Sequence, residues 1–296
     1  MKLDARVAIV TGAGGGLGYS HAMLLARSGA RVVVNDMDLS AATRVAEEIV
    51  ASGGQAIAAA GSVTDESRVA AMVERTMSTW GRVDILINNA GILRDKSFAK
   101  MDLADFRLVL DVHLMGAVIC TKAVWEIMRQ QRYGRIVMTT SSSGLFGNFG
   151  QSNYGAAKMA LVGLMQTLSL EGEKYDIRVN CLAPTAATRM TNDILTKEAL
   201  DKLDPQLVSP GVLALVCDGA PTRAILCAGA GHFARSYVTL TAGAYIGGID
   251  TDAGERVLRQ WDQISAPAEQ IVPAYGFKQS ERELASAGCE VPGASK

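Results

Sequence analysis

Short apolar runs alternate with longer amphipathic stretches along most of the chain. The runs are nearly continuous, as in "RVAIV" and "RVVVN", which is typical of strands buried on both faces of a parallel sheet. They lie at residues 6–10, 31–35, 83–91, 134–142 and 177–184. Hydrophobic residues at helical spacing follow them, at about 17–29, 40–52, 65–80, 104–131 and 153–175.

This alternation predicts an α/β fold with a doubly wound parallel sheet and helices on both faces. Residues 185–210 interrupt the pattern and are expected to form a lid. From about residue 251 the sequence becomes more polar. We therefore expect one domain over residues 1–250, followed by a C-terminal extension with a loose tail over 251–296.

Composition narrows the classes of protein and partner. The 296 residues carry a formal net charge of -1, so no basic face is available to bind nucleic acid. The five cysteines are scattered without a C-x-x-C spacing, which predicts no metal site and no disulfide framework. No apolar run reaches the ~18 residues that span a bilayer, and no apolar leader is visible. We expect a cytoplasmic protein with a small-molecule substrate.

A glycine-rich loop, "TGAGGGLG" at residues 11–18, follows the first strand and opens the first helix. Glycines allow a pyrophosphate to approach the backbone closely, and a helix N-terminus offers free N–H groups and a partial positive charge. A tight strand–helix turn without a ligand is the alternative. The context on both sides favours a dinucleotide site.

Asp36 is the acidic residue at the end of the second predicted strand, 18 residues beyond Gly18. A carboxylate there accepts hydrogen bonds from the adenosine ribose and repels a 2′-phosphate. Neither Met37 nor Asp38 supplies a compensating positive charge. The sequence therefore favours NAD over NADP.

Tyr154 and Lys158 lie four residues apart in "NYGAAK" and share one face of a predicted helix. An ammonium near a phenol favours the phenolate, so we expect a lowered Tyr154 pKa. Such a tyrosine suits proton transfer to or from an alcohol oxygen. Ser141 lies 13 residues upstream, at the end of a predicted strand. A solvated helix face is the alternative interpretation of the pair alone.

Taken together and in order, these motifs and "NNAG" at 88–91 resemble the short-chain dehydrogenases/reductases over about residues 5–250. The resemblance implies a Rossmann-type sheet and hydride transfer between NAD(P) and an alcohol or ketone. It implies that Tyr154 is the general acid/base, that Lys158 binds the nicotinamide ribose, and that Ser141 binds the reacting oxygen. The implied cofactor-binding residues also include Gly12, Gly15, Gly16, Leu17, Gly18, Asp36, Ser62, Val63, Asn88, Ala90, Gly91 and Pro184.

Three positions depart from the common pattern of that family. Ser62 replaces an acidic residue near the adenine, although Val63 can still pack there. Thr185 replaces the glycine that usually follows Pro184. His113, in "DVHLMG", replaces an asparagine that opens the long helix and holds a water relaying protons from the lysine. His113 is either a relay residue or a structural histidine of the core.

The departures resemble the (3R)-hydroxyacyl-CoA dehydrogenase units of peroxisomal multifunctional enzymes type 2 and their stand-alone bacterial relatives. That group includes 17β-hydroxysteroid dehydrogenases, so acyl thioester and steroid substrates both stay open. Reduction of a 3-ketoacyl carrier protein is a third candidate, and Asp36 argues against it. A catalytically silent NAD-binding regulator is the alternative outside the enzymes.

Two surface features complete the expectations. Arg94, Lys96 and Lys100 could meet CoA phosphates, but a solvated face is the favoured interpretation. The resemblance also implies a homodimer or homotetramer, packed through the long helix at about 104–131 and the helix that carries Tyr154.

Overall fold

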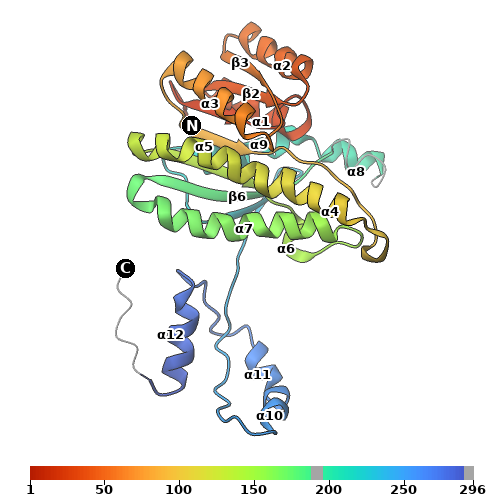
Figure 1. Cartoon of the computed structure of the whole chain (residues 1–296), viewed down its shortest axis with the longest axis vertical. Helices are drawn as coiled ribbons and strands as arrows, with labels where there is room; N and C mark the ends of the chain where they lie inside the picture. The colour runs from red at the N-terminus through yellow and green to blue at the C-terminus, as the bar shows by residue number, and fades with distance from the viewer. Residues whose placement is uncertain (188–195, 290–296) are drawn as a thin grey trace. The chain divides into compact units, whose positions relative to one another are not determined.

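The computed structural model describes residues 1–187 and 196–289, in two compact units, Met1–Ser236 and Tyr237–Lys296. The division falls after Ser236, whereas the change in polarity had suggested a boundary near residue 250. Figure 1 shows the first unit as a sheet flanked by helices.

Eight strands form one sheet in the order β3-β2-β1-β4-β5-β6-β7-β8. All neighbours pair in parallel except β7 and β8, which are antiparallel. The strands are β1 (Val7–Val10), β2 (Arg31–Asp36), β3 (Gln55–Ala60), β4 (Ile85–Asn88), β5 (Gly134–Thr139), β6 (Ile177–Thr185), β7 (Ile225–Gly229) and β8 (His232–Ser236). The predicted doubly wound sheet is confirmed. Its strand order reverses between β1 and β4, where such sheets bind ligands.

The helices of the first unit cover both faces of this sheet (Figure 1). They are α1 (Gly16–Arg27), α2 (Leu39–Ala51), α3 (Glu66–Trp80), η1 (Phe98–Lys100), α4 (Leu103–Leu110), η2 (Asp111–Met115), α5 (Gly116–Gln131), α6 (Ser142–Phe146), α7 (Ser152–Gly172), η3 (Glu173–Tyr175), α8 (Lys197–Lys202), η4 (Pro205–Leu207) and α9 (Ser209–Val216). One core cluster joins α1, α2 and α9 to the sheet, and the other joins α3, α5 and α7. Adjacent strand residues such as Ala8 and Ile9 enter opposite clusters, as alternation along a strand requires.

The helix predicted at about 104–131 is interrupted near its middle. Between α4 and α5 the backbone of η2 takes a π-helical turn, and this turn carries His113. π-turns inside α-helices occur often at functional sites. The interruption lies beside the turn that follows β4, where His113 contacts Ile92.

The run Leu103–Gln131 is long and apolar enough to cross a membrane by length and composition, with a mean hydropathy of 1.6. It is one helix of the α/β fold, however, since Val109, Cys120, Val124 and Met128 are buried in the first unit. We therefore interpret it as a core helix.

The predicted lid is only partly described. Residues 188–195, at its centre, lie outside the described residues. The described flanks are the end of β6, then α8, η4 and the start of α9. The lid stays a prediction.

The second unit contains α10 (Ala253–Arg259), α11 (Trp261–Ser265) and α12 (Phe277–Ser286). One antiparallel bridge joins Leu240 and Ile271. The expectation of a loose tail was wrong for α12. No residue from Tyr237 to Cys289 is buried, so this described part has no hydrophobic core of its own.

Candidate active site

The glycine loop connects β1 to α1 at the switch point of the sheet. A Cβ on Gly18 would lie 2.2 Å from the Gly12 carbonyl oxygen, so only glycine lets the helix start this close to the loop. Gly15 precedes α1 without a side-chain cap. The first N–H groups of α1 therefore remain available to an anion such as a pyrophosphate.

Thr11 and Asn89 hold this loop against the end of β4. The Thr11 hydroxyl accepts hydrogen bonds from the backbone N–H groups of Asn89 at 3.0 Å and Ala90 at 3.1 Å. The Asn89 side chain donates to the carbonyls of Thr11 at 2.9 Å and Gly12 at 3.1 Å. Sequence reasoning missed both residues. The side chain of Asn88, which was predicted, donates instead to Thr121 Oγ1 at 3.1 Å.

Asp36 ends β2 and contacts the glycine loop directly. Its Oδ2 accepts from the Gly14 N–H at 2.9 Å, and its Oδ1 accepts from the Asp38 N–H at 3.1 Å. Arg44 of α2 donates to the Gly14 carbonyl oxygen at 2.9 Å and lies 3.8 Å from Glu48. The sequence analysis missed Arg44 as a cation beside this loop. Its position as a basic residue in the predicted helix after Asp36 could have indicated it.

The other predicted cofactor residues occupy ordinary positions of the fold. Ser62 pairs with the Thr64 hydroxyl at 2.8 Å in the turn before α3, whereas Val63 is buried beside Gly116. Leu17 packs on the core cluster of α1, and Pro184 pairs in register with Ala228 in the sheet. Gly16 is the first residue of α1.

Tyr154 and Lys158 lie one turn apart on α7. The Lys158 ammonium donates to the Thr139 carbonyl oxygen at 2.6 Å and lies 5.4 Å from the centre of the Tyr154 ring. Burial lowers the pKa of Lys158 to about 7. Burial raises the pKa of Tyr154, a hydrogen bond with Ser141 lowers it, and the charge of Asp95 raises it. The expected net lowering of the Tyr154 pKa was therefore wrong for this structure, because desolvation of the phenol dominates.

Ser141 follows β5 and caps α6. Its backbone is extended, and its Oγ accepts from the Ser143 N–H at 3.2 Å. The neighbouring Thr140 hydroxyl donates to the Lys158 carbonyl oxygen at 2.6 Å, which ties the end of β5 to α7. Strand end and helix thus meet at the predicted catalytic residues.

His113 is buried, and its ring contacts Ile92 and Tyr154. Its Nε2 lies 2.7 Å from the Ile92 carbonyl oxygen and 3.0 Å from the Ile92 N–H. Its ring stands edge-on to Tyr154, with centroids 5.2 Å apart. Burial, followed by the charge of Lys158, lowers the pKa of His113 to about 3, so the imidazole is neutral. Its Nδ1 is buried without a hydrogen-bond partner.

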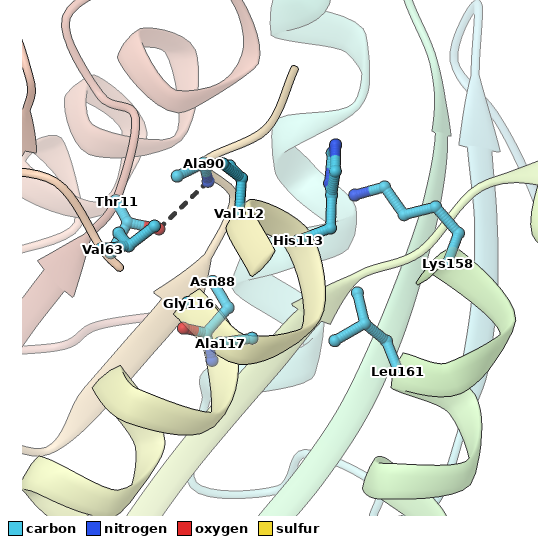
Figure 2. A pocket seen from close by; sticks show the side chains of 10 residues that line it. All are labelled: Thr11, Val63, Asn88, Ala90, Val112, His113, Gly116, Ala117, Lys158 and Leu161. Carbon is cyan, nitrogen blue, oxygen red and sulfur yellow. Dashed lines mark hydrogen bonds between the residues drawn. The ribbon is translucent and has the colours of Figure 1, made fainter. Parts of the chain in front are cut away.

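One pocket brings several of these residues together (Figure 2). Figure 2 shows the Lys158 side chain extending toward the His113 ring. The lining comprises Thr11, Val63, Asn88, Ala90, Val112, His113, Gly116, Ala117, Lys158 and Leu161. A pocket lined by a lysine and a neutral histidine beside a glycine loop can hold a water and move a proton.

Residues 6–199 match the family model of the short chain dehydrogenases. The chain belongs to this family. It is 48% identical over 241 residues to a short-chain type dehydrogenase/reductase of Mycobacterium tuberculosis, covering 78% of this chain and 84% of that protein. It is 44% identical over 276 residues to peroxisomal multifunctional enzyme A of Dictyostelium discoideum, covering 90% of this chain and 61% of that protein.

Solved structures agree with this membership. Full-length peroxisomal multifunctional enzyme type 2 from Drosophila melanogaster aligns with a TM-score of 0.82 and 35% identity, over 97% of this chain and 50% of that chain. A 7α-hydroxysteroid dehydrogenase complexed with NADH and 7-oxo glycochenodeoxycholic acid aligns with a TM-score of 0.72 and 32% identity, over 78% of this chain and 95% of that chain. This chain thus spans about half of the Drosophila protein. The short-chain dehydrogenase described here is an NAD(P)-linked oxidoreductase of hydroxyl or keto groups.

Two of the three basic residues after "NNAG" of this dehydrogenase are paired with acids. Lys96 Nζ lies 3.0 Å from an Asp102 oxygen and 3.5 Å from Asp105, and Arg94 Nε lies 3.7 Å from Asp105. Their charges are partly compensated within the chain. This arrangement favours the solvated face over a dedicated phosphate site.

Proposed function

We propose that this dehydrogenase interconverts a (3R)-hydroxyacyl-CoA and a 3-ketoacyl-CoA with NAD. The observation that carries the proposal is the approach of Tyr154 to two residues that line the pocket beside the glycine loop, the His113 ring at 5.2 Å and the Lys158 ammonium at 5.4 Å from the centre of its ring. The substrate class rests on similarity to peroxisomal multifunctional enzymes along most of this chain.

The loop and pocket fit a dinucleotide. A Cβ at Gly15 would meet no atom within 4 Å, so open space adjoins the uncapped start of α1. His113, whose Nδ1 has no hydrogen-bond partner, lines the pocket. The glycine loop would hold the pyrophosphate, Asp36 the adenosine ribose, and Lys158 the nicotinamide ribose. Bound NAD would supply the acceptor for the hydride of the carbinol carbon.

Side chains of the protein transfer the proton of the substrate hydroxyl. Ser141 Oγ holds the reacting oxygen, and Tyr154 Oη takes its proton during oxidation. Because burial raises the pKa of Tyr154, the phenolate needs a nearby positive charge, which the ammonium form of Lys158 supplies. Lys158 and a water at His113 Nδ1 return the proton to solvent.

His113 would act in this relay as a neutral hydrogen-bonding group, since its pKa is lowered to about 3. The variant His113→Asn should keep the relay and most of the activity, because an amide can bind the same water. The variant His113→Leu should slow the proton-transfer steps across pH. Full activity of the leucine variant would return His113 to a structural role.

NAD is proposed over NADP because the Asp36 carboxylate contacts the glycine loop and the charge of the neighbouring Arg44 is already paired within the chain. Arg44 donates to the Gly14 carbonyl and lies beside Glu48, so its charge is partly committed. Comparison of kcat/KM for the two cofactors tests this proposal. A preference for NADP would refute the role of Asp36.

A steroid alcohol is the second candidate substrate, supported by the similarity to a 7α-hydroxysteroid dehydrogenase. The deciding experiment compares a (3R)-hydroxyacyl-CoA with a 17β-hydroxysteroid under NAD. Faster turnover of the thioester supports the proposal, and faster turnover of the steroid replaces it. Absence of NAD reduction with a panel of secondary alcohols would favour a silent NAD-binding regulator.

We also propose a homodimer or homotetramer in the cytoplasm. Leu103, Leu108 and Met115 on the long helix are exposed, as are Met159 and Leu170 on α7, which supports a further partner surface there. Sedimentation of the purified chain measures the assembly. The five cysteines are all free, which is consistent with a reducing compartment, although similar proteins are named peroxisomal.

A further inference from the structure

A series of hydrogen bonds joins the loop after β4 to the segment before α7, outside the pocket already described. Asp95 Oδ2 accepts from Gln151 Nε2 at 2.6 Å, and Gln151 Oε1 accepts from the Ser143 hydroxyl at 2.8 Å. The Ser143 N–H donates to Ser141 Oγ at 3.2 Å. We call Asp95, Gln151 and Ser143 the clamp. It leads from an exposed carboxylate to the predicted catalytic serine.

Two further contacts hold the same pair of segments together. The Lys96 N–H donates to the Gly150 carbonyl oxygen at 3.0 Å. Asn153 is fully buried; its side chain donates to the Arg94 carbonyl oxygen at 3.0 Å and accepts from the Tyr154 N–H at 2.7 Å. The loop after β4 is therefore linked to the backbone N–H of Tyr154 through Asn153, and to Ser143 through Gln151.

All the hydrogen bonds of the clamp point in one direction. The Ser143 hydroxyl donates to Gln151, and the Gln151 amide donates to the Asp95 carboxylate. Each bond therefore strengthens the next, and the series ends at the negative charge of Asp95. The neighbours of Asp95, which are Arg94 and Lys96, pair with other acids. Within residues 1–187 and 196–289, Asp95 makes no ion pair, and Gln151 is its side-chain partner.

We propose that Asp95 and Gln151 are positioning residues for the reaction. Asp95 fixes the Gln151 amide, Gln151 fixes Ser143 and α6, and the Ser143 N–H fixes Ser141 Oγ relative to Tyr154. The inference rests on the proposed roles of Ser141 and Tyr154. Because the clamp lies outside the glycine loop, its loss should lower kcat without changing the affinity for NAD.

The test compares three exposed-residue variants with (3R)-hydroxybutyryl-CoA and NAD. Asp95→Ala removes the acceptor and should lower kcat about tenfold, the effect of losing one charge-assisted hydrogen bond that positions a reacting group. Asp95→Asn keeps an oxygen acceptor for Gln151 and should recover kcat to within about threefold of the wild type. Asp102→Ala is the matched control, since Asp102 pairs with Lys96 outside the clamp, and should leave kcat unchanged.

Gln151→Ala provides the second line of evidence. It should lower kcat as Asp95→Ala does, and the double variant should be no slower than the slower single variant, because both changes break the same series of bonds. The dissociation constant for NAD, measured by quenching of protein fluorescence, should stay the same in every variant.

Three results would overturn the inference: a kcat of Asp95→Ala within twofold of the wild type, equal losses in Asp95→Ala and Asp95→Asn, or weakened NAD binding in Asp95→Ala. Tyr154→Phe separates this failure from that of the proposed function. If Tyr154→Phe is inactive and Asp95→Ala is fully active, only the positioning role of the clamp is refuted. If Tyr154→Phe is active, the proposed catalytic roles are refuted as well.

Discussion

The substitution Gly91→Ala tests how the "NNAG" turn and His113 depend on each other. A Cβ at position 91 would lie 2.2 Å from Cε1 of the His113 ring, more than 1 Å short of ordinary contact. The ring would have to move, and its Nε2 would lose the contacts of 2.7 and 3.0 Å with Ile92. Overpacking costs about 1–3 kcal/mol, and a buried polar group left unpaired costs about 1–3 kcal/mol. We therefore expect a loss of about 2–6 kcal/mol in the free energy of unfolding.

Urea unfolding of four proteins measures this coupling: the wild type, Gly91→Ala, His113→Ala and the double variant. In the His113→Ala background the clash is gone, so Gly91→Ala should cost less than about 1 kcal/mol. Gly15→Ala is the matched control, because a Cβ there meets no atom within 4 Å. A loss below about 0.5 kcal/mol in Gly91→Ala, or strict additivity in the double variant, would refute the reasoning.

Two further predictions concern stability. The pKa values of buried His21 and His113 are lowered to about 3, whereas an unfolded histidine titrates near 6.5. The unfolded chain therefore binds more protons below pH 6.5, and each ring should remove about 2 kcal/mol of stability by pH 5, levelling off near pH 3. Urea unfolding at pH 7.5 and 5 checks this, with a shallower dependence expected in His21→Asn and an unchanged one counting against it. Asp84 is fully buried and accepts hydrogen bonds from Arg82, Arg6 and the Val7 N–H, so Asp84→Ala should cost about 3 kcal/mol, and a cost below 1 kcal/mol would contradict that role.

The sequence predicted the sheet because buried parallel strands and amphipathic helices differ in period and composition. It missed β7 and β8, where "ILCAG" and "HFARS" are short, carry small or polar residues, and turn through the left-handed residues Ala230 and Gly231. A hairpin of this kind carries little of the alternation on which the other strands were predicted.

The position of a residue in the fold was predictable where it depends on local pattern. Tyr154 and Lys158 lie on one helix and Asp36 ends a strand, as their patterns predicted. Their assignment to one site rested also on the resemblance to the family. Thr11 and Asn89 are 78 positions apart, and their hydrogen bonds leave no periodic signal in the sequence. The raised pKa of Tyr154 was also beyond sequence reasoning, because burial of the phenol depends on the packing of segments far apart in the chain.

The central claim is that Tyr154 transfers the proton of the reacting alcohol, and Tyr154→Phe tests it most directly. The phenyl ring keeps the edge-on contact with His113, 5.2 Å between centroids, while the hydroxyl is lost. Initial rates with a (3R)-hydroxyacyl-CoA and NAD, together with the dissociation constant for NAD, should show turnover reduced at least ~1,000-fold with NAD binding unchanged. Substantial residual turnover in the Tyr154→Phe enzyme would contradict the account.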